Sequence, residues 1–206
     1  IVQVADQSNL ILDPDLDSYY LMDLTIIAIP ELIEALGKAR GGASAMVASK
    51  QVTPQNIVSL YLYHHDISRI LLRTQTSLKT AFENTQNRQL NSQLASFENT
   101  LQTNISQFLS LIKNDIERSS SVSINASQVF DTGSLAIQAA NDLLEKTTPQ
   151  LEGLLTERVR TIRQGRDQHL VIIAVASFFA IVIGLLIVTS IQQQVKNIRE
   201  NIHKII

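Results

Sequence analysis

Apolar residues recur at spacings of three and four along most of the chain, which is the period of an α-helix. Four such stripes are separated by polar stretches, at Val2 to Leu36, Ile57 to Phe82, Leu90 to Ile112 and Ile137 to Ile162. Each stripe needs a neighbour against which to bury its apolar side chains. The pattern therefore predicts an all-α protein with four long helices packed as an antiparallel four-helix bundle.

The members of three stripes are expected to form the core. In the first stripe they include Leu12, Leu16, Tyr19, Asp23, Ile26, Ile29, Ile33 and Leu36. In the second stripe they are Ile57, Leu60, His64, Ile67, Leu71, Leu78 and Phe82. In the third they are Leu90, Leu94, Phe97, Leu101, Ile105, Phe108 and Ile112, opposite a face of Ser, Gln, Asn and Thr.

Helix ends are marked by caps, turns and glycines. Thr53-Pro54 predicts a helix start, because threonine caps orphan N–H groups and proline fits the first turn. The polar stretches 84–88 and 119–127 predict the next two turns, and the first helix is expected to end between Gly41 and Lys50.

Two prolines fall inside the predicted helices. Pro14 does not shift the phase of the first stripe, which favours a helix that only kinks there. The alternative is a new helix capped by Asp13, with Pro14 at its first position. Pro149 lies within the fourth helix and is expected to bend it.

The stretch 170–191 contains twenty-two residues without a charge. A helix of that length covers ~33 Å, about the thickness of a bilayer hydrocarbon core. It is therefore predicted to span a membrane. Within it, Ala176, Ala180 and Gly184 repeat at four-residue spacing, which predicts a close helix–helix contact in a dimer.

The apolar pattern continues beyond this span as a heptad seam, at Val188, Ile191, Val195, Ile198, Ile202 and Ile205. A simple tail anchor needs no such seam. The pattern indicates a helix that carries movement out of the membrane.

Composition excludes several classes of function. The net charge is −2, so no basic field for nucleic acid exists, and the absence of cysteine excludes disulfides and thiolate metal sites. No nucleophile elbow, phosphate loop or metal-binding helix motif occurs. We expect no enzyme activity in this segment and no cofactor. Because the chain starts with Ile and has no export signal, we expect it to be a fragment cut at both ends.

Two stretches resemble a group of bacterial transmembrane receptors. The stretch 6–23 (DQSNLILDPDLDSYYLMD) resembles their first extracytoplasmic helix, and the stretches 131–140 and 149–158 resemble their last. These domains precede chemotaxis transducer, sensor histidine kinase and diguanylate cyclase output domains. The resemblance implies a periplasmic domain, a homodimer in the inner membrane, and a span that leads into a cytoplasmic HAMP linker.

This resemblance sets the orientation, because arginines and lysines flank the span on both sides and the positive-inside rule favours neither direction. The expected domains are a periplasmic sensor at 1–169, the span at 170–191 and the start of a linker at 192–206. A HAMP linker usually has proline where this chain has Gln194. A plain coiled coil is therefore equally open.

The expected function is sensory input and transmembrane signal transmission for a chemotaxis transducer or a sensor histidine kinase. The alternatives are an input module of a diguanylate cyclase and a membrane-anchored structural or fusion-type bundle. The expected partners are a second copy, the lipid bilayer, and a small-molecule ligand or a periplasmic binding protein of unknown identity.

The candidate ligand-binding residues are Asn9, Asp13, Asp17 and Tyr20. Asn9 and Asp23 are polar members of the first stripe, and a role in fixing helix register is favoured over ligand binding. They lie ~21 Å apart along a helix, so that one small ligand cannot contact both.

Two patterns suggest metal but fit it poorly. Asp13, Asp15 and Asp17 mimic the start of a calcium loop, but Ser18 replaces the required glycine and Leu24 replaces the final glutamate. His64 and His65 are adjacent, so their side chains diverge by ~100° on a helix. His64 is expected to be a hydrogen-bonded core residue, and no metal site is predicted.

Overall fold

A computed structural model describes residues 15–50, 53–117 and 124–203, with only the backbone described at 115–117 and 194–203. The described part is helical and contains no strand. The chain divides into two units, Ile1–Leu155 and Thr156–Ile206. The sensor boundaries expected from the sequence, 1–169 and 170–191, stay a prediction.

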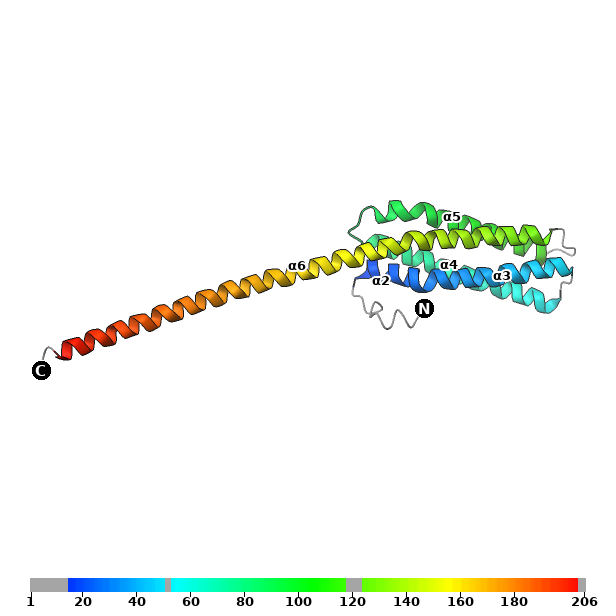
Figure 1. The fold of residues 1–206 in the computed structure, drawn as a ribbon. Helices are drawn as coiled ribbons and strands as arrows, with labels where there is room; N and C mark the ends of the chain where they lie inside the picture. The colour runs from blue at the N-terminus through cyan, green and yellow to red at the C-terminus, as the bar shows by residue number, and fades with distance from the viewer. Residues whose placement is uncertain (1–14, 51–52, 118–123, 204–206) are drawn as a thin grey trace. The chain divides into compact units, whose positions relative to one another are not determined.

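Four helical segments make up the described part (Figure 1). The first comprises α2 (Leu16–Met22), the π-helical η2 (Asp23–Ala28) and α3 (Ile29–Ser49) without a break. The second is α4 (Pro54–Asn84), and the third is α5 (Leu90–Leu111), which continues as the π-helical η3 (Ile112–Glu117). The fourth is α6 (Ala126–His203). The sequence therefore predicted the helical class and the number of helices in the described part.

Helix ends follow the local signals. The Thr53 side chain accepts a hydrogen bond from the Asn56 backbone N–H at 3.2 Å, which confirms the predicted cap of α4. Asn125 caps α6 in the same way, accepting from the Gln128 N–H at 2.7 Å. Lys50 ends α3 in the left-handed region, with φ of 52°.

The π segment η2 has a cause in the sequence that follows it. Pro30 has no N–H to donate to the carbonyl of Ile26, and its ring crowds that carbonyl. A wider turn with i→i+5 bonds accommodates the proline without ending the helix. The buried residues keep spacings of three and four through this segment, as at Met22, Thr25 and Ile29.

The core of the first unit draws on all four helical segments, with α3 and α2 packed against α4. Its largest fully buried side chains are Phe108, Leu21, Met22, Leu24, Ile29, Leu32, Leu36, Leu60, Ile67, Ile70, Leu78 and Leu90. On α5 and at the start of η3 the predicted stripe is confirmed, since all its members are buried except Phe97, which is half-buried. The opposite face is exposed, as at Gln93.

Other parts of the predicted core were wrong. Leu16 is 48% exposed, because the buried face of α2 passes through Leu21 and Met22 instead. His64 is only half-buried, because the buried face of α4 runs through Leu60, Ile67 and Thr74.

The core face of α6 also ends earlier than predicted. Val159 is 48% and Ile162 is 66% exposed, whereas Leu151 is buried. Pro149 lies inside α6 without ending it. The alternatives for the chain at Pro14 concern residues outside the described part.

A close approach of three helices surrounds Gly133 on α6. A Cβ added there would lie 2.9 Å from Cγ of Arg40 on α3 and 3.0 Å from Cε2 of Phe108 on α5. Arg40 also donates a hydrogen bond to Ser134 at 2.8 Å, and its guanidinium lies 4.4 Å from the ring centre of Phe130. A larger residue at this position would therefore have to displace Arg40 or Phe108.

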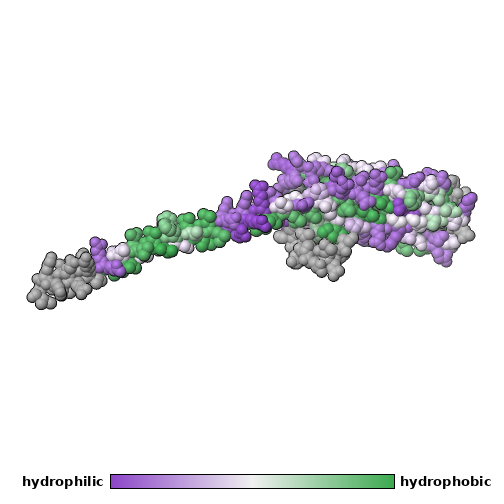
Figure 2. Space-filling model, viewed as in Figure 1, coloured by the Kyte–Doolittle hydropathy of each residue, from purple (hydrophilic) through white to green (hydrophobic). Residues whose placement is uncertain are grey.

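The second unit contains the charge-free part of α6. Among the described residues, α6 is the helix long and apolar enough to cross a membrane, and its most apolar stretch has no buried residue. Figure 2 shows this stretch as a continuous hydrophobic segment between hydrophilic ends.

Candidate functional site

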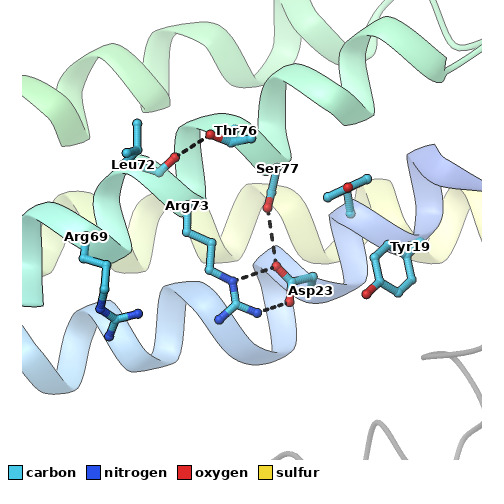
Figure 3. Close-up of a pocket in the computed structure, with 8 residues that line it drawn as sticks. Tyr19, Asp23, Arg69, Leu72, Arg73, Thr76 and Ser77 are labelled. Carbon is cyan, nitrogen blue, oxygen red and sulfur yellow. Dashed lines mark hydrogen bonds and ion pairs between the residues drawn. The ribbon is translucent and has the colours of Figure 1, made fainter.

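A pocket of about 470 Å³ lies between α2–η2 and α4 in the first unit. Figure 3 shows Arg73 and Ser77 pointing toward Asp23, whereas Arg69 lies farther along α4. The lining residues are Tyr19, Tyr20, Asp23, Arg69, Leu72, Arg73, Thr76 and Ser77. Its volume is in the range of small-molecule sites.

Asp23 is the buried centre of this pocket. Its two carboxylate oxygens accept hydrogen bonds from Arg73, one from Nη2 and one from Nε at 3.3 Å. The Ser77 hydroxyl donates a further bond at 3.4 Å. The Asp23 side chain is 12% exposed, so these partners supply the compensation that a buried carboxylate needs.

Glu31 on α3 extends this network outside the pocket lining. Its carboxylate lies 3.1 Å from Nη2 of Arg69 and 3.6 Å from Nη1 of Arg73. The Arg69 side chain is 51% exposed and that of Glu31 is 39% exposed. The Arg69–Glu31 pair is consequently a solvated ion pair of the kind that stabilises little.

Helical spacing explains why these groups meet. Arg69, Arg73 and Ser77 are four residues apart on α4 and so lie on one face of that helix. Tyr19 and Asp23 are related in the same way across the start of η2. The rings of Tyr19 and Tyr20 pack edge to face, with centres 5.3 Å apart, and form the aromatic side of the pocket.

Of the two predicted ligand-binding residues that the structure describes, Tyr20 lines this pocket and Asp17 does not. Asp17 is buried on α2, and its Oδ1 accepts a hydrogen bond from the Ser18 N–H at 2.7 Å. Asn9 and Asp13 lie outside the described residues. Within the described ranges, no three His, Cys, Asp or Glu residues gather as metal ligands would.

Arg69 and Arg73 were not predicted from the sequence, because only the apolar stripe of the second helix was considered. Asp23 could have indicated these arginines. It lies on an apolar stripe, and a carboxylate that becomes buried there needs a cationic partner. The four-residue spacing of Arg69, Arg73 and Ser77 places such partners on one face of α4.

His64 and His65 do line one pocket, together with Tyr61, Ser68 and Lys113. The prediction that His64 is a core residue was wrong. Its lining contains two histidines and no Cys, Asp or Glu, fewer than three ligating side chains of these types.

The residues predicted for the membrane contact and the signalling seam lie on α6. Ala176, Ala180 and Gly184 are exposed there, and Ile191 is 55% exposed. Val195, Ile198 and Ile202 have a helical backbone, and Ile205 lies outside the described residues. The dimer contact and the seam stay predictions.

Comparison with known proteins gives no relative. No protein-family model, no curated protein and no solved structure matches the chain. The functional argument therefore rests on the sequence pattern and on the geometry of the two units.

Proposed function

We propose that this chain is the sensory input and transmembrane transmission module of a bacterial receptor, either a chemotaxis transducer or a sensor histidine kinase. A diguanylate cyclase is the alternative output. In this proposal the first unit is a periplasmic antiparallel four-helix bundle, the protein is a homodimer in the inner membrane, and the linker after the span is cytoplasmic.

The observation that carries the proposal is the continuity of α6. One helix from Ala126 to His203 includes core residues of the first unit, such as Ala136 and Leu143, and also the charge-free stretch 170–191. A helix without a break is able to pass a small translation, tilt or rotation along its axis.

The pocket at Asp23 supports a sensing role for the first unit. It joins α4 to the segment around η2 through side chains that a ligand is able to contact. A ligand shifts a signalling equilibrium only by its differential affinity for two packings of the receptor. A ligand that contacts both helices would have such a difference if their packing changed between the two states.

Site-specific labelling tests the proposed topology. Because the chain contains no cysteine, single cysteines can be read without background. A membrane-impermeant maleimide should label Ser110→Cys in intact spheroplasts and label Gln193→Cys only after permeabilisation; both positions are exposed in the structure. Labelling of both positions in intact spheroplasts, or the reverse pattern, would contradict the topology.

The coding sequence after Ile206 tests the signalling role. We expect it to continue into a kinase, cyclase or chemotaxis signalling domain. A stop codon shortly after Ile206 would instead favour a membrane-anchored structural bundle.

A further inference from the structure

We propose that the arginine-rich flank before the charge-free stretch of α6 binds the phosphate groups of anionic phospholipids, with Arg163 and Arg166 as the principal contacts. This flank comprises residues 156–169 and lies wholly in the second unit. The lipid contact requires the membrane span and in this respect rests on the proposed function. It does not depend on the sensory role or on the output domain.

The flank carries a surplus of positive charge. It contains four arginines against two acidic residues, Glu157 and Asp167. Glu157 lies 3.5 Å from Arg160, and Asp167 lies 2.9 Å from Arg166. All four of these side chains are more than 60% exposed, and such solvated pairs contribute little to stability. Both arginines are therefore able to exchange their partners at little cost.

Three of the arginines share one face of α6. Arg160, Arg163 and Arg166 follow one another at a spacing of three, and all three are exposed. Residues three apart are neighbours on the surface of a helix. Arg163 has no ion pair and no hydrogen bond from its side chain to any residue that the structure describes. This basic face is therefore available to an anionic partner.

The position of these arginines along the helix favours lipid as that partner. The charge-free stretch begins at Leu170, and at ~1.5 Å per residue Arg166 lies ~6 Å and Arg163 ~10.5 Å before it. The headgroup layer is ~5–7.5 Å thick on each side of the hydrocarbon core. Arginine side chains near the end of a span extend toward this layer, where a guanidinium group forms bidentate hydrogen bonds with phosphate. Both arginines are therefore placed to contact lipid phosphate.

The flank on the other side of the span has a different composition. It begins with three glutamines at 192–194, and its first charged residue is Lys196. The proposed topology places the arginine-rich flank in the periplasm, where the positive-inside rule expects few basic residues. Binding of anionic lipid accounts for arginines at this end of the span, whereas their use as an orientation signal does not.

Electron paramagnetic resonance of spin-labelled lipids tests the contact with the whole chain in bilayers of phosphatidylcholine. Labelled phosphatidylglycerol and labelled phosphatidylcholine report the relative affinity for an anionic and a zwitterionic headgroup. We expect a preference for phosphatidylglycerol of at least ~3-fold, since one basic residue at an anionic surface contributes up to ~5-fold. This preference should fall as the salt concentration rises.

The double variant Arg163→Gln with Arg166→Gln should reduce the preference to less than ~1.5-fold, whereas lysine at both positions should retain it because the charge remains. Arg160→Gln is the matched control. It removes the same charge from the same face, but ~15 Å before Leu170 and so beyond the headgroup layer, and should retain most of the preference. All three positions are exposed, so these substitutions are compatible with folding.

Three outcomes would overturn the proposed contact: no preference in the unaltered chain, an unchanged preference in the double glutamine variant, or an equal loss in Arg160→Gln. A preference abolished by inorganic phosphate at matched ionic strength would also overturn it, because the arginines would then bind soluble phosphate. Every variant should insert into phosphatidylcholine bilayers, since the stretch 170–191 is unchanged. Failure of the unaltered chain to insert would overturn the span itself, and is thereby distinguished from a loss of lipid preference with insertion intact.

Discussion

Arg73 on α4 donates hydrogen bonds to both carboxylate oxygens of Asp23 in the π-helical segment, fifty residues earlier in the chain. The pair ties the widened turn of the first helix to the middle of α4. It also places a buried charge at the base of a pocket. In the proposed sensory function, a ligand in this pocket would act on a contact that also stabilises the fold.

Asp23→Asn and Arg73→Gln should each lower the stability of the first unit by about 1–3 kcal/mol, because each leaves the partner charge with fewer hydrogen bonds. The double variant should be more stable than the sum of the single effects predicts. Thermal unfolding followed by circular dichroism measures both quantities.

The exposed pair Lys79–Glu83 on α4 is the control for this experiment, with side chains 75% and 61% exposed. Its removal should change stability by less than about 0.5 kcal/mol. Strictly additive effects of Asp23→Asn and Arg73→Gln would mean that the pair does not couple the two helices.

Leu94→Ala and Leu101→Ala on α5 should each destabilise the first unit by about 2–5 kcal/mol, since both side chains are fully buried. Phe97→Ala should cost less than a fully buried phenylalanine would, because Phe97 is half-buried. Gln93→Ala, on the exposed face, should have little effect. Equal losses at Gln93 and Leu94 in a denaturant titration would contradict this packing.

Gly133→Val should destabilise the first unit by about 1–3 kcal/mol, because its side chain would press on Arg40 and Phe108. Gly153→Ala is the matched control in the same helix, where an added Cβ meets nothing within 4 Å. It should stabilise α6 by up to about 1 kcal/mol, the difference in helix propensity. A melting temperature that rises in both variants would disagree with the close approach at Gly133.

The buried residues were predicted most accurately where a helix has a single, uninterrupted apolar stripe. On α5 the stripe from Leu90 to Ile112 matches the buried face because no proline interrupts it. In the first helix the count ran through Leu16, whereas the buried face runs through Ser18, Met22, Thr25 and Ile29, which keep the same three-and-four spacing. The period alone does not decide between two neighbouring faces that both fit it.

The candidate site was less accessible to prediction from the sequence. Asp23 and Arg73 meet only because α2–η2 and α4 pack together, and no local pattern fixes that pairing. Tyr20 was predicted as a ligand-binding candidate, and it lines the pocket. Asp17 was also predicted as a ligand-binding candidate, but its side chain is buried and accepts a hydrogen bond from the Ser18 backbone N–H.

The proposed homodimer makes a further prediction in the charge-free stretch of α6. Single cysteines from Val171 to Val188 should cross-link with a helical period that peaks at Ala176, Ala180 and Gly184. Small side chains at four-residue spacing allow two helices to approach closely. Uniform cross-linking, or none, would remove this face as the dimer contact.

The central claim is that α6 transmits a signal mechanically from the first unit through the membrane. Its most direct test is the output of the full-length receptor after insertions between Gln192 and Gln193. One inserted alanine rotates the downstream helix by ~100° relative to the span, whereas seven residues nearly restore the phase, within ~20°. We predict that one residue locks or abolishes the output and that seven largely preserve it, with membrane insertion unchanged in both. A normal ligand response after the single insertion would mean that this region is a flexible tether, and would contradict mechanical transmission.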